Sequence, residues 1–107
     1  MVDGIRFDSV TEAIRYRDLK MWLDCGEVRQ IRLQPVYHLG CPENTYRADF
    51  EVTYRDGEVW TEDVKGFETA KFKHDRRLWA SYGPNELRIL KRVRGRWQTE
   101  SIKGGGK

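Results

Sequence analysis

Two aspartates and a lysine lie on neighbouring segments that predict a β-hairpin, and their chemistry is that of phosphate ester hydrolysis. Asp49 belongs to the alternating segment 45–54, and Asp63 and Lys65 belong to the next one, 59–65. Two carboxylates with waters and a phosphate oxygen suit the octahedral oxygen coordination of Mg²⁺. A lysine beside them could orient a water or stabilise charge on a phosphate. The three residues therefore predict a candidate metal site.

The turn between the two segments decides whether the aspartates share a face of the hairpin. A two-residue Asp56-Gly57 loop would mix apolar and charged residues on both faces, whereas a three-residue loop starting at Arg55, with Gly57 left-handed, separates them. The three-residue loop places Asp49 directly opposite Asp63, where like charges are unfavourable unless a cation offsets them. The accompanying register pairs Tyr54 with Glu58, Val52 with Trp60, Phe50 with Glu62, Ala48 with Val64 and Arg47 with Lys65. The alternative is an exposed sheet face on which Lys65 and Arg47 neutralise the aspartates.

Three further side chains have both a chemical and a structural interpretation. Ser9-x-x-Glu12 is a capping box, so Glu12 is either a helix cap or a carboxylate near the site. Gln34 is either a polar strand-edge residue or a hydrogen-bonding support for a ligand carboxylate or a phosphate. Glu62 is expected on the core side, where a buried carboxylate needs a partner, and Arg15 of the first helix is our candidate.

A basic helix is expected directly after Lys65. Its side chains are either DNA phosphate contacts or a solvated helix face, and its N-terminus could present a hydroxyl and backbone donors to a phosphate. The candidate contacts are Thr69, Lys71, Lys73, Arg76 and Arg77.

The elements that must position these residues follow from periodicity and turn signals. We expect a helix from residues 8–12 to Gly26, a strand 28–39 broken at Gln34-Pro35, the two hairpin strands, a helix 69–82, and two closing strands. The closing strands are predicted at 86–93 and 97–102. This order predicts an α+β fold with one mixed sheet flanked by helices. Residues 1–103 form the expected single domain, and residues 104–107 a flexible glycine-rich tail.

Length, charge and cysteine content limit the number of domains and the kinds of partner that the chain can have. A chain of 107 residues with a net charge of +3 fits one compact domain. Residues 1–63 hold 8 Lys+Arg against 13 Asp+Glu, and residues 64–107 hold 12 against 4, a division that favours a polyanionic partner. The absence of a long apolar run predicts no membrane span, and the spacing of cysteine and histidine predicts no zinc site. We therefore expect a cytoplasmic protein.

The order of the acidic residues and the lysine resembles the PD-(D/E)xK nuclease superfamily. Over residues 5–90, four motifs resemble a small phage and prophage endonuclease family akin to Holliday-junction resolvases. These motifs are Phe7-Asp8-Ser9-x-x-Glu12, Gln34-Pro35, Tyr46-x-Ala48-Asp49-Phe50 and Glu62-Asp63-Val64-Lys65-Gly66-x-x-Thr69. One departure is Ala48, which stands where the superfamily name has proline.

The resemblance implies a restriction-endonuclease-like fold and hydrolysis of DNA phosphodiesters with Mg²⁺ or Mn²⁺. It implies that Asp49 and Asp63 bind the metal, that Glu12 assists them and that Lys65 is the catalytic lysine. Branched DNA is the substrate that it favours, and symmetric cleavage would require a homodimer. The alternatives are a non-catalytic nucleic-acid-binding module, or a nuclease for linear or single-stranded DNA.

Overall fold

The computed structural model describes residues 3–106 and contains two helices and seven strands in that range. The elements are α1 (Val10–Asp24), β1 (Val28–Leu33), β2 (Val36–His38), β3 (Thr45–Arg47), β4 (Phe50–Tyr54), β5 (Val59–Val64), α2 (Ala70–Tyr82), β6 (Glu86–Val93) and β7 (Arg96–Ile102). None of the helices in the described range has the length and apolar character needed to span a membrane.

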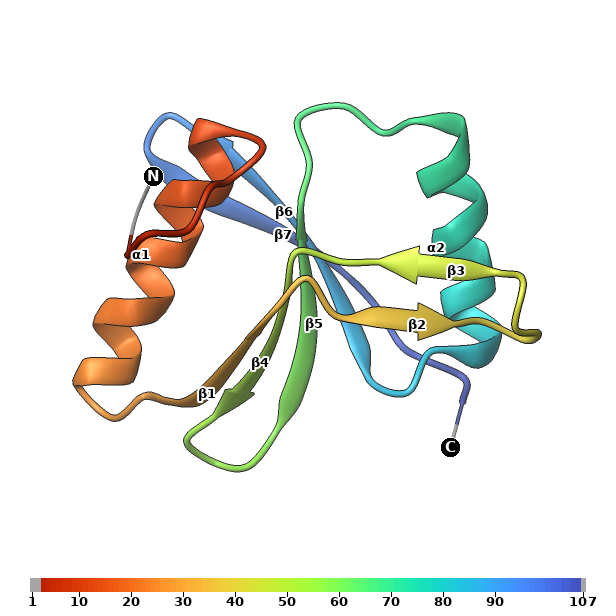
Figure 1. Ribbon diagram of the computed structural model, residues 1–107, viewed down its shortest axis with the longest axis horizontal. Helices are drawn as coiled ribbons and strands as arrows, with labels where there is room; N and C mark the ends of the chain where they lie inside the picture. Colours follow the sequence, from red (N-terminus) through yellow and green to blue (C-terminus); the bar gives the residue numbers. More distant parts are fainter. Residues whose placement is uncertain (1–2, 107) are drawn as a thin grey trace.

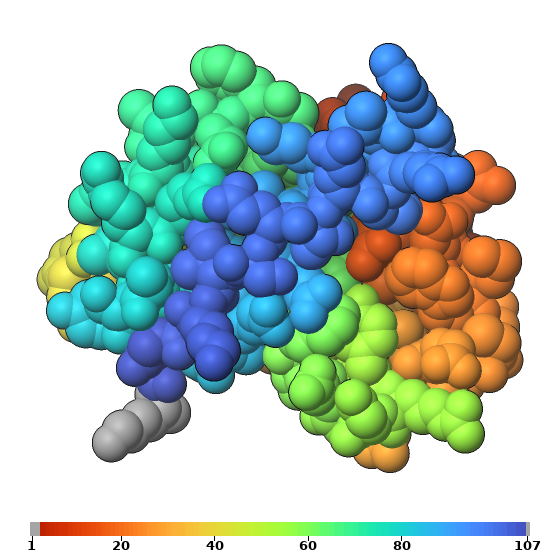
Figure 2. Space-filling view, turned by 180° about the vertical axis from the view of Figure 1, so that it is seen from behind, coloured from red at the N-terminus to blue at the C-terminus, as the bar shows by residue number. Residues whose placement is uncertain are grey.

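The main sheet is mixed and has the strand order β1-β4-β5-β6-β7. Strands β5 and β6 are parallel and joined by α2, and the other neighbouring pairs are antiparallel. Helix α1 covers one side of this sheet, and α2 with the small β2-β3 ribbon covers the other (Figure 1). Seen from behind, β6 and β7 cross the molecule between the two helices (Figure 2). The α+β class is confirmed, and the arrangement is compatible with a restriction-endonuclease-like fold.

Alternation along the central strands supplies a core on each side of the sheet. Phe50 and Val52 of β4 pack with Tyr16 and Leu19 of α1. On the opposite side, Leu87 and Ile89 of β6 pack with Phe72 and Trp79 of α2, together with residues of the β2-β3 ribbon. Because side chains on a strand alternate between faces, β5 contributes Glu62 to the α1 side and Asp63 to the α2 side.

The predicted partner of Glu62 is confirmed. Glu62 is fully buried, and its Oε1 accepts a hydrogen bond of 2.8 Å from Nε of Arg15 in α1. The Tyr54 hydroxyl donates to the other carboxylate oxygen. A buried carboxylate is thus given a charged partner and a second donor, which offsets much of its desolvation.

The hairpin register is also confirmed, but the first predicted strand is shorter than expected. Phe50 pairs with Glu62 and Val52 with Trp60, and the turn contains Gly57 at φ 91°. The segment 45–54, however, is divided into β3 and β4 by Ala48 and Asp49, because β3 leaves the main sheet to pair with β2. The β4–β5 ladder therefore ends at the pair Phe50–Glu62, and the pairings predicted beyond it are wrong. Arg47 pairs with Val36 instead of Lys65, and neither Ala48 with Val64 nor Asp49 with Asp63 is a ladder pair.

Residues 104–106 of the glycine-rich terminus lie against the end of α2. Gly106 donates a backbone hydrogen bond of 3.0 Å to the carbonyl of Gly83 at the end of α2. A Cβ built on Gly104 would lie 2.1 Å from the same carbonyl oxygen, so only glycine allows this approach. The structure thus places residues 104–106 against the end of α2, and their flexibility stays a prediction; Lys107 lies outside the described residues.

Candidate active site

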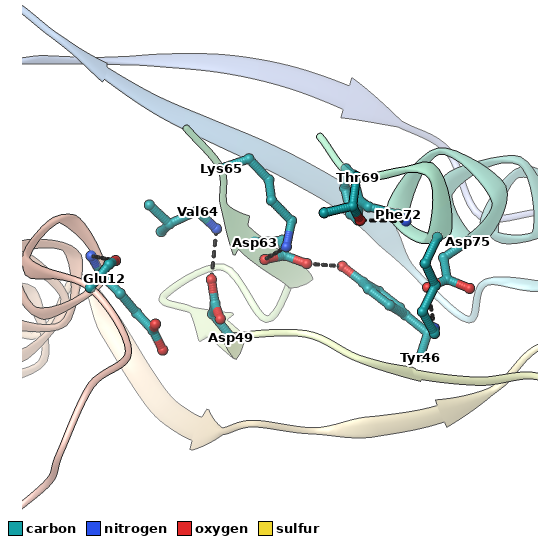
Figure 3. A network of polar contacts seen from close by, with 11 residues as sticks. Glu12, Tyr46, Asp49, Asp63, Val64, Lys65, Thr69, Phe72 and Asp75 are labelled. Atoms are coloured by element: carbon teal, nitrogen blue, oxygen red, sulfur yellow. Dashed lines mark hydrogen bonds and ion pairs between the residues drawn. The ribbon is translucent and has the colours of Figure 1, made fainter. Parts of the chain in front are cut away.

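The residues singled out for chemistry meet at one end of the main sheet. Glu12 comes from the first turn of α1, Asp49 immediately precedes β4, Asp63 lies near the end of β5 and Lys65 follows it. In Figure 3, Glu12 points from its helix toward Asp49, and Asp63 lies between Asp49 and Tyr46. Helix α1, the hairpin and the β2-β3 ribbon each contribute to this cluster.

Asp49 is held in place by backbone hydrogen bonds although it lies outside the β4–β5 ladder. Its Oδ2 accepts a 2.8 Å hydrogen bond from the backbone N–H of Val64, on the strand that carries Asp63. Its carbonyl accepts a 2.9 Å hydrogen bond from the backbone N–H of Gln34. The first contact brings the carboxylate across the strand gap, so Asp49 and Asp63 lie close together despite the break in the strand.

Asp63 is the most deeply buried acid of the cluster, with 1% of its surface exposed. Its Oδ2 accepts a hydrogen bond from the hydroxyl of Tyr46. Its Oδ1 lies 3.2 Å from Nζ of Lys65, yet it accepts no hydrogen bond from any described residue, because the ammonium does not approach it with suitable geometry. The carboxylate thus has one oxygen with a donor and one that is available to a ligand.

Burial and mutual repulsion raise the pKa values of these carboxyl groups. Burial raises the pKa of Asp63 to about 7, the charge of Asp49 adds to the increase, and Lys65 opposes it. Burial also raises the pKa of Asp49, although its contact with Asp63 and the hydrogen bond from the Val64 N–H oppose this effect. A site that disfavours its own negative charges in this way favours binding of a proton or a cation.

Glu12 is both a helix-capping neighbour and a member of the cluster. Its backbone N–H donates a 3.1 Å hydrogen bond to Oγ of Ser9, as a capping box predicts. Its carboxyl group faces the site (Figure 3), where burial first, and then the charges of Asp8 and Asp63, raise its pKa, while its contact with Asp49 lowers it. With only 4% of the residue exposed, Glu12 is a third acid of the cluster.

Lys65 is held at the edge of the cluster. Its backbone N–H donates a 2.9 Å hydrogen bond to the carbonyl of Leu90 on β6. Its Nζ lies 4.6 Å from the centre of the Phe72 ring, in a cation–π contact, and the side chain is 26% exposed. The ammonium group is therefore both close to Asp63 and reachable from solvent.

The donor set fits a hard divalent cation that keeps part of its water shell. Within residues 3–106 no group of three or more His, Cys, Asp and Glu side chains is already gathered closely enough to hold a metal ion. Mg²⁺ retains several waters and commonly takes only one or two carboxylates from a protein. Asp63 Oδ1, which is ion-paired with Lys65 and has no hydrogen-bond donor, and the adjacent Asp49 carboxylate are the oxygens that could act as those two ligands, and Glu12 lies beside Asp49.

The predicted DNA contacts on α2 differ in their exposure to solvent and in whether an acid already pairs with them. Lys71 donates to Asp75 at 2.6 Å but is 70% exposed, and it lines an open hollow shared with Lys65 and Thr69. Thr69 caps α2 by accepting a hydrogen bond from the Phe72 N–H. Lys73 and Arg77 are exposed, and no acid within residues 3–106 pairs with either. Their role in DNA binding stays a prediction.

Two residues have roles in the structure that sequence reasoning missed. Arg76 bridges Glu68, at 2.6 Å, and Glu100 of β7, so this predicted DNA contact already holds two acids. Tyr46 belongs to the motif Tyr46-x-Ala48-Asp49-Phe50, but the motif does not predict its contact with Asp63. The break between β3 and β4 brings the Tyr46 hydroxyl to the Asp63 carboxylate.

Gln34 contacts Asp49 through its backbone and not through the side-chain hydrogen bond that the sequence predicts. Gln34 is exposed and adopts φ 50°, a conformation uncommon outside glycine, and its backbone N–H makes the contact with Asp49. It supports Asp49 by shaping the bend between β1 and β2.

Comparisons with known proteins add a family and a distant structural likeness. A family model described as "Protein of unknown function (DUF1064)" matches residues 1–106. A search of curated proteins found no match. The solved structure described as "Crystal structure of SSO0001" is similar at 12% sequence identity and a TM-score of 0.45. That match covers 89% of this chain and 51% of the other, so this chain spans about half the length of that protein.

Proposed function

The chain belongs to the DUF1064 family, and we propose that it is a metal-dependent DNA endonuclease of the PD-(D/E)xK type. The observation that carries the proposal is the cluster of Glu12, Asp49 and Asp63 beside Lys65, with one buried Asp63 oxygen lacking a hydrogen-bond donor. These three acids and the accessible lysine are the site residues that the resemblance to PD-(D/E)xK nucleases implies, and they lie together at one end of the sheet.

The metal ligands in this proposal are Asp49 and Asp63, assisted by Glu12. The chemistry that bound Mg²⁺ or Mn²⁺ supplies at such a site is charge neutralisation of a phosphate oxygen and a lower pKa for an attacking water. Asp63 must give up the proton that burial favours before it can act as a ligand, because metal ligands bind deprotonated. The Tyr46 hydroxyl fixes one Asp63 oxygen and so directs the other toward the cluster.

Lys65 acts on the phosphate or the attacking water in this proposal. Its Nζ lies 3.2 Å from Asp63 Oδ1, so it is next to the proposed metal ligand and still reachable from solvent. An ammonium group in that position hydrogen-bonds and orients a water, and it stabilises negative charge as it develops on the phosphate. The exposed cations Lys73 and Arg77 of α2 are proposed to contact flanking phosphates.

Branched DNA and a homodimer belong to the proposal as well. One site cuts one strand, so symmetric cleavage of a junction requires two copies of the chain. Residues 3–106 form a small domain with principal extents of 36 × 30 × 26 Å, which leaves one copy little surface with which to read a branched substrate.

The test is cleavage of four-way junction, duplex and single-stranded DNA, each with Mg²⁺, with Mn²⁺ and with chelator. We expect metal-dependent cutting, strongest on the junction, that Asp63→Asn and Lys65→Ala abolish. Asp56→Asn and Lys103→Ala are matched controls, because both residues are exposed and Asp56 keeps its turn oxygen as asparagine.

Three outcomes would contradict parts of the proposal. Binding of DNA without cutting in either metal would favour a non-catalytic nucleic-acid-binding module. Normal cutting by Asp63→Asn and Lys65→Ala would exclude the mechanism. Cutting confined to linear or single-stranded DNA would remove branched DNA as the substrate.

A further inference from the structure

The loop that follows Lys65 carries an aromatic ring that the fold leaves in solvent. Phe67 is 80% exposed, although a phenylalanine side chain normally contributes to stability by being buried. It lies two residues after Lys65 and two before Thr69, the N-cap of α2. An exposed ring so close in sequence to the proposed site is available to contact a ligand that binds there.

The loop is anchored on both sides of Phe67. The Lys65 N–H is hydrogen-bonded to the carbonyl of Leu90, and the Glu68 carboxylate accepts a 2.6 Å hydrogen bond from Arg76. Figure 1 shows the loop between β5 and α2 projecting past the end of the sheet, at the top of the view. These contacts hold the loop in a conformation that leaves Phe67 exposed.

The charges on either side of the loop favour a polyanion over an apolar protein surface. Lys65, which precedes the loop, and Lys71, in the first turn of α2, line one open hollow. Glu68, the acid adjacent to Phe67 in sequence, is paired with Arg76 and lies 4.0 Å from Lys91, so its repulsion toward phosphate is offset. Proteins that bind single-stranded nucleic acid combine cationic side chains with aromatic rings on which bases stack.

We propose that Phe67 stacks on an unpaired DNA base close to the scissile phosphate. Two residues of extended chain span at most about 7 Å, which bounds the distance between the Cα atoms of Lys65 and Phe67 and keeps the loop that carries the ring next to the proposed site. Bases inside a duplex are already stacked on both faces. Phe67 therefore selects DNA whose strands separate at the cut, and this inference rests on the proposed function.

The experiment measures binding in chelator, where no cleavage is needed. A forked DNA carries a fluorescent purine analogue at its first unpaired position, and a fully paired duplex carries it at the same position. We expect wild-type protein to quench the analogue in the fork. Phe67→Ala should lose the quenching and bind the fork about tenfold more weakly, with duplex binding unchanged, whereas Phe67→Trp should keep both properties. Tyr82→Ala removes another exposed aromatic, on the far end of α2, and should behave as wild type.

The outcomes separate this inference from the nuclease proposal. Loss of quenching in Phe67→Ala supports base stacking even if the protein cuts no DNA. Unchanged quenching, equal weakening on fork and duplex, or no DNA binding by the wild type would overturn it. A dimer in sedimentation that Phe67→Ala dissociates, with quenching retained, would assign the ring to a second copy of the chain and would also overturn it.

Discussion

Replacing Asp63 by asparagine should remove the largest part of the pH dependence of folding stability. Burial raises the pKa of Asp63 from 3.8 to about 7 in the folded protein, so between these values the folded state binds a proton that the unfolded state has released. The free energy of unfolding then falls by about 1.4 kcal/mol for each pH unit. This stabilising contribution is complete below the unfolded pKa and is lost as the pH rises through the folded pKa.

The loss between about pH 5 and about pH 7 amounts to at most about 3 kcal/mol, or on the order of 10 °C in Tm for a domain of this size. Asparagine keeps an oxygen to accept the Tyr46 hydrogen bond and carries no charge. Asp63→Asn should therefore lose much less free energy of unfolding than the wild type between these pH values, measured by urea titration in chelator, and the remaining fall comes from Asp49 and Glu12, whose pKa values burial also raises.

Asp56→Asn is the control, because it changes an exposed acid in the hairpin turn and should follow the wild type at every pH. A wild-type free energy of unfolding that does not fall over this range would refute the reasoning. So would an equally steep fall in Asp63→Asn, because the proton would then be bound elsewhere.

Three further changes have expected outcomes. Mg²⁺ should raise the wild-type Tm more above about pH 7 than below it, because ligands bind deprotonated, and an equal shift in Asp49→Asn would contradict the proposed site. Arg15→Ala should cost about 3–5 kcal/mol in urea unfolding by leaving buried Glu62 without its guanidinium; exposed Arg17→Ala should cost less than about 0.5 kcal/mol. Gly104→Ala places a Cβ against a carbonyl oxygen of α2, so backbone amides of the terminus should exchange hydrogen faster; unchanged exchange would show that the terminus is free in solution.

The hairpin and its register were predictable because they depend on local chemistry. A left-handed glycine in a three-residue turn and alternation along two strands leave only one register that separates apolar from charged residues. The partner of Glu62 was predictable for a similar reason, since alternation points it toward α1, where a buried carboxylate requires a cation.

The exact surroundings of the aspartates were not predictable from local patterns. The chain leaves the main sheet between β3 and β4 because β3 pairs with β2, and alternation within a segment does not specify which other strand that segment pairs with. The contact between Tyr46 and Asp63 depends on that departure. The docking of Gly104 likewise depends on the position of the end of α2, so composition alone suggested a free tail.

The uneven charge of the sequence acquires a physical meaning at the site. Each of the four acids after residue 64 forms an ion pair with a base from the same part of the chain, and Arg76 serves two of them. Residues 1–63 contain an exception, because three of their acids lie near one another. Glu12, Asp49 and Asp63 share one adjacent base, Lys65. Gathering them lowers stability near neutral pH, because burial and repulsion both oppose their ionisation. A doubly charged cation would offset that repulsion, and for this reason the cluster supports a metal-dependent function more strongly than the basic surface supports DNA binding.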